Sequence, residues 1–351
     1  MKEIGSEFMT NSTRVGNNKY EFLNNYPKKF VLSGRTGLHL ISQEIKDKIN
    51  VLSIALPSYC CGSMISPFIK QGFKISFYDP FDFEKMMLND NVQVVLIMDY
   101  FGFVTNQTFE FALKCKQNGK TIIVDATQTS FSKSKTYDLA DYIIVSCRKW
   151  TDCLGAIVYS KHGFVSDNSS KAQVSYNSTW RKAADLKCRY IQRGTGDKKE
   201  FLSMYVSANH ILDEDYSGYR MEPEEVDIWK TADSDYLRKK RRDNAAFLME
   251  QIEKMSFYHK IKLMFEDMGD EDCPMFVPIL LDSGKRGFVR GELIKNSIYC
   301  PVHWPIDERY PHQKTIYHEQ ELSLICDQRY GLDEMKKQAN ALLYALTLLE
   351  K

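Results

Sequence analysis

Between residues 51 and 160 the chain repeats one pattern, in which a short apolar run is followed by a longer mixed segment. The apolar runs predict strands at 51–56, 74–79, 92–100, 121–126, 142–147 and 154–160. They do not alternate apolar with polar residues, which is typical of strands covered on both faces. The segments between them predict helices at 61–70, 82–90 and 105–118. This alternation predicts an α/β fold with a mainly parallel sheet covered by helices.

The second half of the chain has a different pattern. Helical segments are predicted from about 178 to 257, followed by a small α/β unit that closes with a helix at 332–349. Within that unit the predicted strands are 259–265, 274–281, 298–302 and 320–325, with a helix at 286–295. A chain of 351 residues fits one large and one smaller domain. We therefore predict a large domain over 9–235 and a small C-terminal α/β domain over 236–351.

The first eight residues, MKEIGSEF, precede a second methionine and contain GSEF, which is typical of a cloning scar. We interpret residues 1–8 as a remnant of cloning and leave them out of the fold prediction.

Composition excludes several classes of protein. The net charge is +1, so no basic or acidic field indicates binding to nucleic acid or to a membrane surface. The basic run 239–242 could be a nucleic-acid patch, but on a helix of a neutral protein it is interpreted as a solvated face. No apolar run approaches the ~18 residues of a membrane span, and no signal peptide is evident. The chain has nine cysteines, which is an odd number, and their spacing is irregular, without a CxxC pair. This pattern indicates free thiols in a cytoplasmic protein and no metal site.

Two neighbouring strand ends carry the most informative chemistry. Asp125 and Gln128 follow the strand 121–126, while Ser146 and Lys149 follow the strand 142–147. A lysine that forms a Schiff base and an acid that holds a pyridinium nitrogen are what a pyridoxal phosphate site requires. Two structural interpretations stay open, because a loop lysine is usually solvated and an aspartate is often a turn former. Arg148 could lower the pKa of Lys149 or could point away.

Other strand ends and turns offer compatible groups. The turn formed by Ser33, Gly34, Arg35 and Thr36 precedes a helical run and could hold a phosphate, or could be an ordinary helix cap. Tyr59 follows the strand 51–56 and could stack on a cofactor ring or lie in the core. Cys61 lies in the same turn, and Tyr100 ends the strand 92–100.

Taken in order, these motifs resemble the DegT/StrS group of pyridoxal-phosphate aminotransferases. SGRTGLHL is similar to that group's phosphate segment, LPSYCCGS to its PSYTC segment, DYFGF to its HYFG turn, VDATQT to its EDAAQ motif and VSCRKW to its lysine motif. Near the C-terminus, YCPVHWP and LSLICDQRYGLDEM resemble the ending on the substrate side. The resemblance extends from about residue 28 over nearly the whole chain, except for 165–235, and it implies a fold type I transferase.

The resemblance also implies the roles of the cofactor-binding residues. Lys149 becomes the Schiff-base lysine and the proton shuttle, Asp125 the partner of the pyridinium nitrogen, and Gln128 the residue that orients the ring. Ser146 and the turn from Ser33 to Thr36 are expected to hold the phosphate of pyridoxal 5′-phosphate. Departures from the family pattern are Asp99 in place of histidine, Trp150 in place of asparagine, and TDCLGA in place of a glycine-rich stretch.

The expected function is transfer of an amino group from an amino acid, by resemblance glutamate, to a keto sugar linked to a nucleotide, within surface polysaccharide synthesis. The residues expected on the substrate side are Tyr100, His303, Trp304 and Arg329, although His303 could equally be a packed structural residue. A homodimer is expected from the resemblance alone. Two alternatives remain open: a pyridoxal-phosphate enzyme acting on a non-sugar substrate, and a non-catalytic protein of the same fold.

Overall fold

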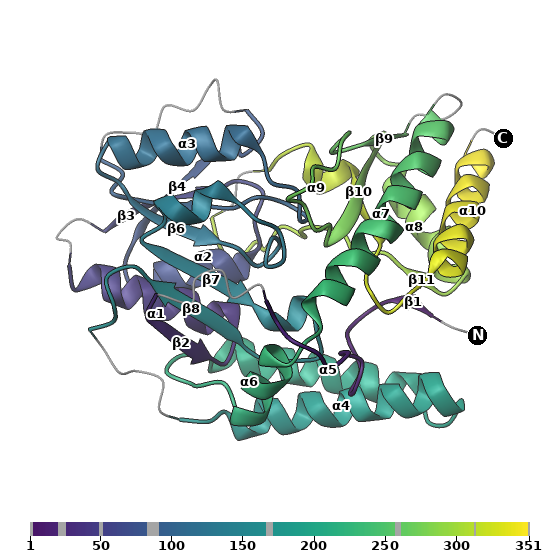
Figure 1. Ribbon diagram of the computed structural model, residues 1–351, viewed down its shortest axis with the longest axis horizontal. Helices are drawn as coiled ribbons and strands as arrows, with labels where there is room; N and C mark the ends of the chain where they lie inside the picture. Colours follow the sequence, from purple (N-terminus) through teal and green to yellow (C-terminus); the bar gives the residue numbers. More distant parts are fainter. Residues whose placement is uncertain are drawn as a thin grey trace.

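The computed structural model describes residues 3–19, 26–48, 52–82, 91–165, 171–256, 261–311 and 314–349 (Figure 1). Its larger sheet has seven strands in the order β2-β8-β7-β6-β5-β3-β4. The strands are β2 (Lys28–Val31), β3 (Ser53–Pro57), β4 (Lys74–Tyr78), β5 (Val94–Ile97), β6 (Thr121–Asp125), β7 (Tyr142–Ser146) and β8 (Ala156–Ser160). Pairings from β4 through β7 are parallel, whereas β8 runs antiparallel to both neighbours. The predicted mainly parallel sheet is therefore confirmed.

The two faces of this sheet belong to two different hydrophobic clusters. In β6, Ile123 packs into one cluster, while Ile122 and Val124 pack into the other. Helices α1 (Gly34–Lys46) and α2 (Gly62–Lys70) contribute to the first cluster, and α3 (Asn106–Gln117) contributes to the second. Both faces are thus covered, which is the physical reason that the strands read as continuous apolar runs. The helix predicted at 82–90 lies almost wholly outside the described residues.

The chain then forms a helical segment and a smaller sheet. Helices α4 (Val174–Arg193) and α5 (Lys198–Glu214) pack as a hairpin, followed by α6 (Pro223–Lys230) and the long α7 (Ser234–Ser256) (Figure 1). The smaller sheet is antiparallel, in the order β12 (Glu321–Ile325), β10 (Phe276–Leu281), β9 (Ile261–Leu263). Helices α8 (Arg286–Lys295) and α10 (Leu332–Leu348) pack against one another beside it, and the short α9 (Tyr317–Gln320) precedes β12. The predicted boundary at 235/236 falls at the first turn of α7, and the division into two domains stays a prediction.

The N-terminal residues are part of the folded structure. Strand β1 (Ile4–Gly5) pairs in parallel with β11 (Ile298–Tyr299), and the Ile4 side chain is fully buried. The backbone N–H of Gly5 donates to the Tyr330 hydroxyl at 2.9 Å. Leaving these residues out of the fold was therefore wrong, because their contacts are made with distant parts of the chain. Their interpretation as a remnant of cloning stays a prediction.

All nine cysteines are free thiols in the structure. Among the helices that the structure describes, none is long and apolar enough to cross a membrane.

Candidate functional site

A cavity of about 640 Å³ lies where β6 and β7 end. The N-terminal segment, the first turns of α1 and α2, helix α5 and the ends of β11 and β12 also contribute to its lining. Most of the residues predicted for the site line this cavity: Ser33, Gly34, Arg35, Cys61, Asp125, Gln128, Ser146, Lys149, His303, Trp304 and Arg329. Ligands of open α/β sheets gather at such strand ends. The structure therefore brings together groups that the sequence places far apart.

Lys149 ends a short 3-10 turn, Cys147–Lys149, that directly follows β7. Its side chain is exposed to the cavity, and no described residue hydrogen-bonds its amine. The charge of Arg148 is the largest influence that lowers the pKa of Lys149, burial lowers it further, and Glu7 opposes the shift. Arg148 is thus a neighbour of the amine, which the sequence left open. A lowered pKa increases the free amine that can attack a carbonyl.

Asp125 and Gln128 present complementary hydrogen-bonding groups in the cavity that Lys149 also lines. Asp125 is the last residue of β6, and its Oδ1 accepts a hydrogen bond from the Thr127 backbone at 2.9 Å. Burial raises the pKa of Asp125, while the hydrogen bonds from Thr127 act in the opposite direction. The Gln128 Oε1 accepts from the backbone N–H of Phe101 at 2.6 Å, which fixes the orientation of the amide. The Gln128 NH₂ has no partner among the described residues, so the cavity wall offers an acid and an amide donor.

The start of α1 lies against the end of β7. Ser33 caps the helix, with its Oγ accepting from the Thr36 backbone at 3.1 Å. A Cβ on Gly34 would lie 3.5 Å from the Ser146 Cβ. The first N–H groups of a helix and the positive end of its dipole favour an anion at this position. The helix-cap interpretation and the phosphate interpretation are compatible here, because the cap uses the Ser33 side chain and leaves backbone groups available.

Three predicted residues do not line the cavity. Thr36 is buried, and its Oγ1 donates to the backbone oxygen of Tyr216 at 2.7 Å. Tyr59 is fully buried in an aromatic cluster, and its hydroxyl donates to the backbone oxygen of His303. The Tyr100 hydroxyl donates to the backbone oxygen of Tyr59 at 2.8 Å. The predicted contacts of these three with cofactor or substrate are therefore corrected, since each side chain points into the core. Tyr59 instead supports the loop that carries His303.

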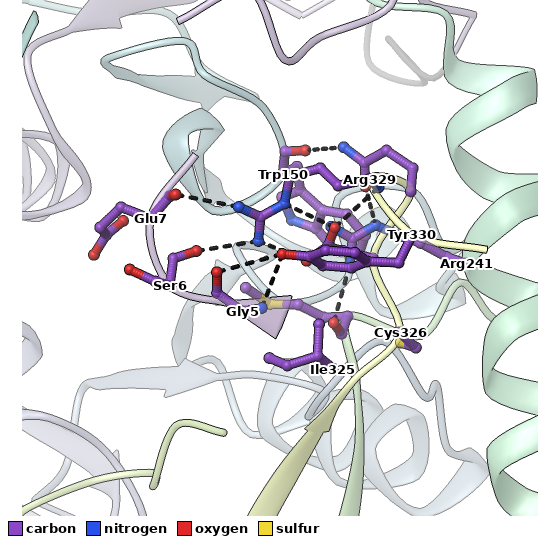
Figure 2. Close-up of polar contacts among 12 residues, drawn as sticks. Gly5, Ser6, Glu7, Trp150, Arg241, Ile325, Cys326, Arg329 and Tyr330 are labelled. Carbon is purple, nitrogen blue, oxygen red and sulfur yellow. Dashed lines mark hydrogen bonds and ion pairs between the residues drawn. The ribbon is translucent and has the colours of Figure 1, made fainter. Parts of the chain in front are cut away.

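Arg329 anchors the N-terminal segment to the cavity wall, as Figure 2 shows. It pairs with the Asp327 carboxylate at 2.9 and 2.7 Å. It also donates to the backbone oxygens of Glu7 and Ser6, each at 3.1 Å. Four of its five N–H groups are thereby used. Its predicted contact with substrate stays a prediction, and the structure gives it a second role.

Glu7 is a cavity residue that the sequence interpretation missed. Burial alone would raise the pKa of its carboxyl, but the charges of Arg148, Lys149, Lys187 and Arg329 together lower it. No sequence signal marked this residue, because its neighbours come from α4, the turn after β7 and the loop before α10.

Arg241 was also missed, because the basic run 239–242 was interpreted as a solvated face. It is 1% exposed, and it lies over the Trp150 ring with its guanidinium carbon 4.4 Å from the centroid. Its Nε donates to Gln328 Oε1 at 2.8 Å, and Gln328 in turn donates to the Trp150 backbone oxygen at 2.6 Å. The spacing contained the signal, since Arg241 lies four residues before Ala245 and seven before Leu248 on one buried helix stripe.

No protein-family model matches this sequence, and no curated protein matches it. Solved structures do resemble it. PseC from Helicobacter pylori, described as an aminotransferase involved in the biosynthesis of pseudoaminic acid, has a TM-score of 0.68 at 14% identity and covers 99% of this chain and 100% of its own. The putative sugar aminotransferase Spr1654 from Streptococcus pneumoniae, in its PLP form, has a TM-score of 0.61 at 12% identity over 98% and 93%. DesI, solved in the presence of its TDP-sugar product, has a TM-score of 0.64 at 12% identity over 98% and 94%.

At this level of identity the likeness concerns the fold. It confirms the predicted α/β fold class, a mainly parallel sheet flanked by helices as in fold type I transferases. The chain therefore has the fold of these aminotransferases.

Proposed function

We propose that this protein is a pyridoxal-phosphate-dependent aminotransferase that moves an amino group from an amino acid to a keto sugar. One observation carries the proposal: Asp125 ends β6, Lys149 ends the turn after the paired strand β7, and both line one cavity. A lysine with a lowered pKa beside a buried carboxyl is the pair that this cofactor requires. A non-catalytic protein of the same fold would not require both the lysine and the carboxyl in one cavity.

The residues of the cavity fit the cofactor. Ser33, Gly34 and Ser146 would hold its phosphate at the N-terminus of α1, where backbone N–H groups favour an anion. Asp125 would pair with the ring nitrogen, and the unpartnered NH₂ of Gln128 would donate to the ring oxygen. When bound, the cofactor supplies an electron sink and carries the amino group between the two substrates.

The chain itself supplies binding, orientation and proton transfer. With the cofactor bound, the Lys149 amine would move the proton from the donor carbon to a carbon of the cofactor, and it would move a proton in the opposite direction when the acceptor is aminated. Arg148 holds the pKa of that amine down, so a free base exists for this step. Asp125 keeps a proton at the ring nitrogen, since a carboxylate there stabilises the positive ring. The N-terminal segment, which Arg329 anchors, forms one side of the cavity.

The substrates are proposed from the resemblance and from the named structural neighbours. Glutamate is the proposed amino donor, and a nucleotide-linked keto sugar destined for a surface polysaccharide is the proposed acceptor. Support for a sugar comes from the descriptions of Spr1654 as a putative sugar aminotransferase and of DesI with its TDP-sugar product. His303 and Trp304 line the cavity on the side of the smaller sheet and are proposed to contact the sugar. A homodimer remains part of the proposal.

The first experiment is an absorbance spectrum of the purified protein with pyridoxal phosphate, followed by addition of glutamate. We expect a band near ~420 nm that glutamate bleaches, and its loss in Lys149→Ala. Lys198→Ala is the matched control, because Lys198 also lines the cavity but pairs with Glu3 and the Tyr299 hydroxyl.

The absence of the band in the wild type, or the same band in Lys149→Ala, would overturn the proposal. Incubation with glutamate and candidate keto sugars, with detection of 2-oxoglutarate and of the aminated product, then separates a sugar acceptor from a non-sugar one.

A further inference from the structure

Behind the cavity wall, Glu321, Ser323 and His303 form a chain of hydrogen bonds. Glu321 and Ser323 lie on β12, and both are fully buried. The Ser323 hydroxyl donates to Glu321 Oε1 and lies 2.9 Å from the Nδ1 of His303. Glu321 Oε2 accepts from the backbone N–H of His303 at 2.9 Å. The carboxylate thus fixes both the backbone and the ring of His303.

The positions of the protons follow from this arrangement. A serine hydroxyl has one proton, and Ser323 gives it to Glu321. Toward His303 the Ser323 oxygen can therefore only accept, so the proton of the neutral ring must be on Nδ1. The Nε2 atom of the ring is then left with a lone pair and acts as a hydrogen-bond acceptor.

The remaining ring atoms of His303 face the cavity. His303 lines the cavity and its side chain is 12% exposed, while its Nε2 has no partner among the described residues. Aromatic rings hold the imidazole on its sides, with centroids at 5.3 Å for Phe101, 5.2 Å for Phe276 and 5.2 Å for Trp304. The Tyr59 hydroxyl holds its backbone oxygen. The acceptor atom is therefore held in place before any ligand arrives.

We propose that His303 recognises a hydroxyl group of the keto-sugar acceptor through Nε2, and that Ser323 and Glu321 are positioning residues that set its tautomer. This rests on the proposed function. An acceptor nitrogen between aromatic rings binds an O–H donor and does not attract carboxylate or phosphate oxygens, which are acceptors themselves. Cations such as Arg35 and Arg148 lie elsewhere on the cavity wall and suit the anionic groups. The amino group of the donor is the group that reacts at the cofactor, which leaves only its carboxylates for other contacts, so the acceptor sugar is the substrate that His303 distinguishes.

The tautomer can be measured without any substrate. In ¹⁵N spectra of the histidine-labelled protein, we expect His303, identified by its loss in His303→Asn, to carry its proton on Nδ1. Ser323→Ala should shift the ring toward the other tautomer. Ser283→Ala is the matched control, because Ser283 also hydrogen-bonds a glutamate, Glu319, but at the surface. A wild-type ring protonated on Nε2, or a tautomer that Ser323→Ala leaves unchanged, would overturn the positioning role.

The two half-reactions test the contact with substrate. Asparagine at 303 keeps a donor near the Nδ1 position but lacks the distal acceptor, whereas glutamine restores a polar group near the Nε2 position. We expect His303→Asn to raise the KM for the sugar acceptor on the order of tenfold, the effect of one lost hydrogen bond. The cofactor band and the half-reaction with glutamate should be unchanged, and His303→Gln should recover part of the loss.

Equal effects on both half-reactions, or none on either, would overturn the assignment of His303 to the acceptor. Failure of the proposed function would look different, because the wild type would show no band that glutamate bleaches. In that case the NMR measurement still decides whether the hydrogen-bond chain sets the tautomer.

Discussion

At the scale of single residues, Lys149 lies between two opposite charges. Arg148, its neighbour in sequence, lowers the pKa of the Lys149 amine, and Glu7 from the N-terminal segment raises it. The fraction of free amine at neutral pH therefore depends on the balance of these two side chains. Because Glu7 reaches the site only through the fold, a distant part of the chain takes part in tuning the lysine.

Removing either charge should change the pH dependence of the rate at which cofactor-free protein binds pyridoxal phosphate, and the two changes should be in opposite directions. Arg148→Gln should raise the pKa of Lys149, so less free amine exists at neutral pH and the pH–rate profile moves to higher pH. Glu7→Gln should move the profile to lower pH. The rate at which the absorbance band forms, measured from pH 6 to 10, checks both.

Arg148→Lys keeps the positive charge and is the control, with a profile close to that of the wild type. Shifts of Arg148→Gln and Glu7→Gln in the same direction would contradict this electrostatic account of Lys149.

At the scale of elements, the packing of α1 on the large sheet depends on Gly37. A Cβ at this position would lie 2.2 Å from Ile144 Cδ1 and 2.8 Å from Val158 Cγ2. Gly37→Ala should therefore lower the free energy of unfolding by about 1–3 kcal/mol through overpacking. Gly291 lies inside α8 with nothing within 4 Å of its would-be Cβ, so Gly291→Ala should raise the free energy by about 0.5–1 kcal/mol.

Urea denaturation of the two alanine variants checks this pair of predictions. If Gly37→Ala proved as stable as the wild type, the close approach of α1 to β7 and β8 would not hold in solution.

The N-terminal segment is the second element whose attachment can be tested. Tyr330→Phe removes the hydroxyl that accepts from the Gly5 backbone and leaves that N–H without its partner. We expect a loss of about 1–2 kcal/mol in the free energy of unfolding and faster amide hydrogen exchange at Gly5. Tyr344→Phe, at a tyrosine 58% exposed on α10, is the control and should change neither quantity. Unchanged exchange at Gly5 in Tyr330→Phe would show that β1 is held by other contacts alone.

At the scale of the whole molecule, a buried lysine makes stability depend on pH. Burial lowers the pKa of Lys187 from 10.5 to about 7, with a further contribution from Arg329, and its Nζ donates to the Glu7 backbone oxygen. Between these two pH values the unfolded chain binds more protons than the folded one. The contribution of Lys187 to stability should therefore rise with pH across this window, by at most about 1.4 kcal/mol per pH unit.

Urea denaturation of the wild type and of Lys187→Met at pH 7, 8 and 9 checks this prediction. The contributions of the other titrating groups cancel when the free energy of unfolding of Lys187→Met is subtracted from that of the wild type. The free energy of the wild type should increase relative to that of Lys187→Met as the pH rises. A difference that is constant with pH would mean that Lys187 is not buried as the structure shows.

The sequence by itself determined six of the seven strands of the large sheet and the centre of the site, whereas the edge strand β2 was not predicted. Continuous apolar runs specify strands covered on both faces, and polar residues at the ends of β6 and β7 had to meet because neighbouring parallel strands end at one sheet edge. Asp125, Gln128, Ser146 and Lys149 could therefore be placed together from local patterns. The apolar runs and the polar residues that end them are properties of short segments, so they can be recognised without knowledge of distant contacts.

Only the tertiary structure decided which distant side chains complete the cavity. The pairing of β1 with β11 and the hydrogen bond from the backbone N–H of His303 to Glu321 each join segments that no local pattern connects. The same limit explains Tyr59, because a tyrosine after a strand carries no signal that tells a cavity wall from the core. Long-range contacts are set by how packed elements face one another, and that information exists only in the folded chain.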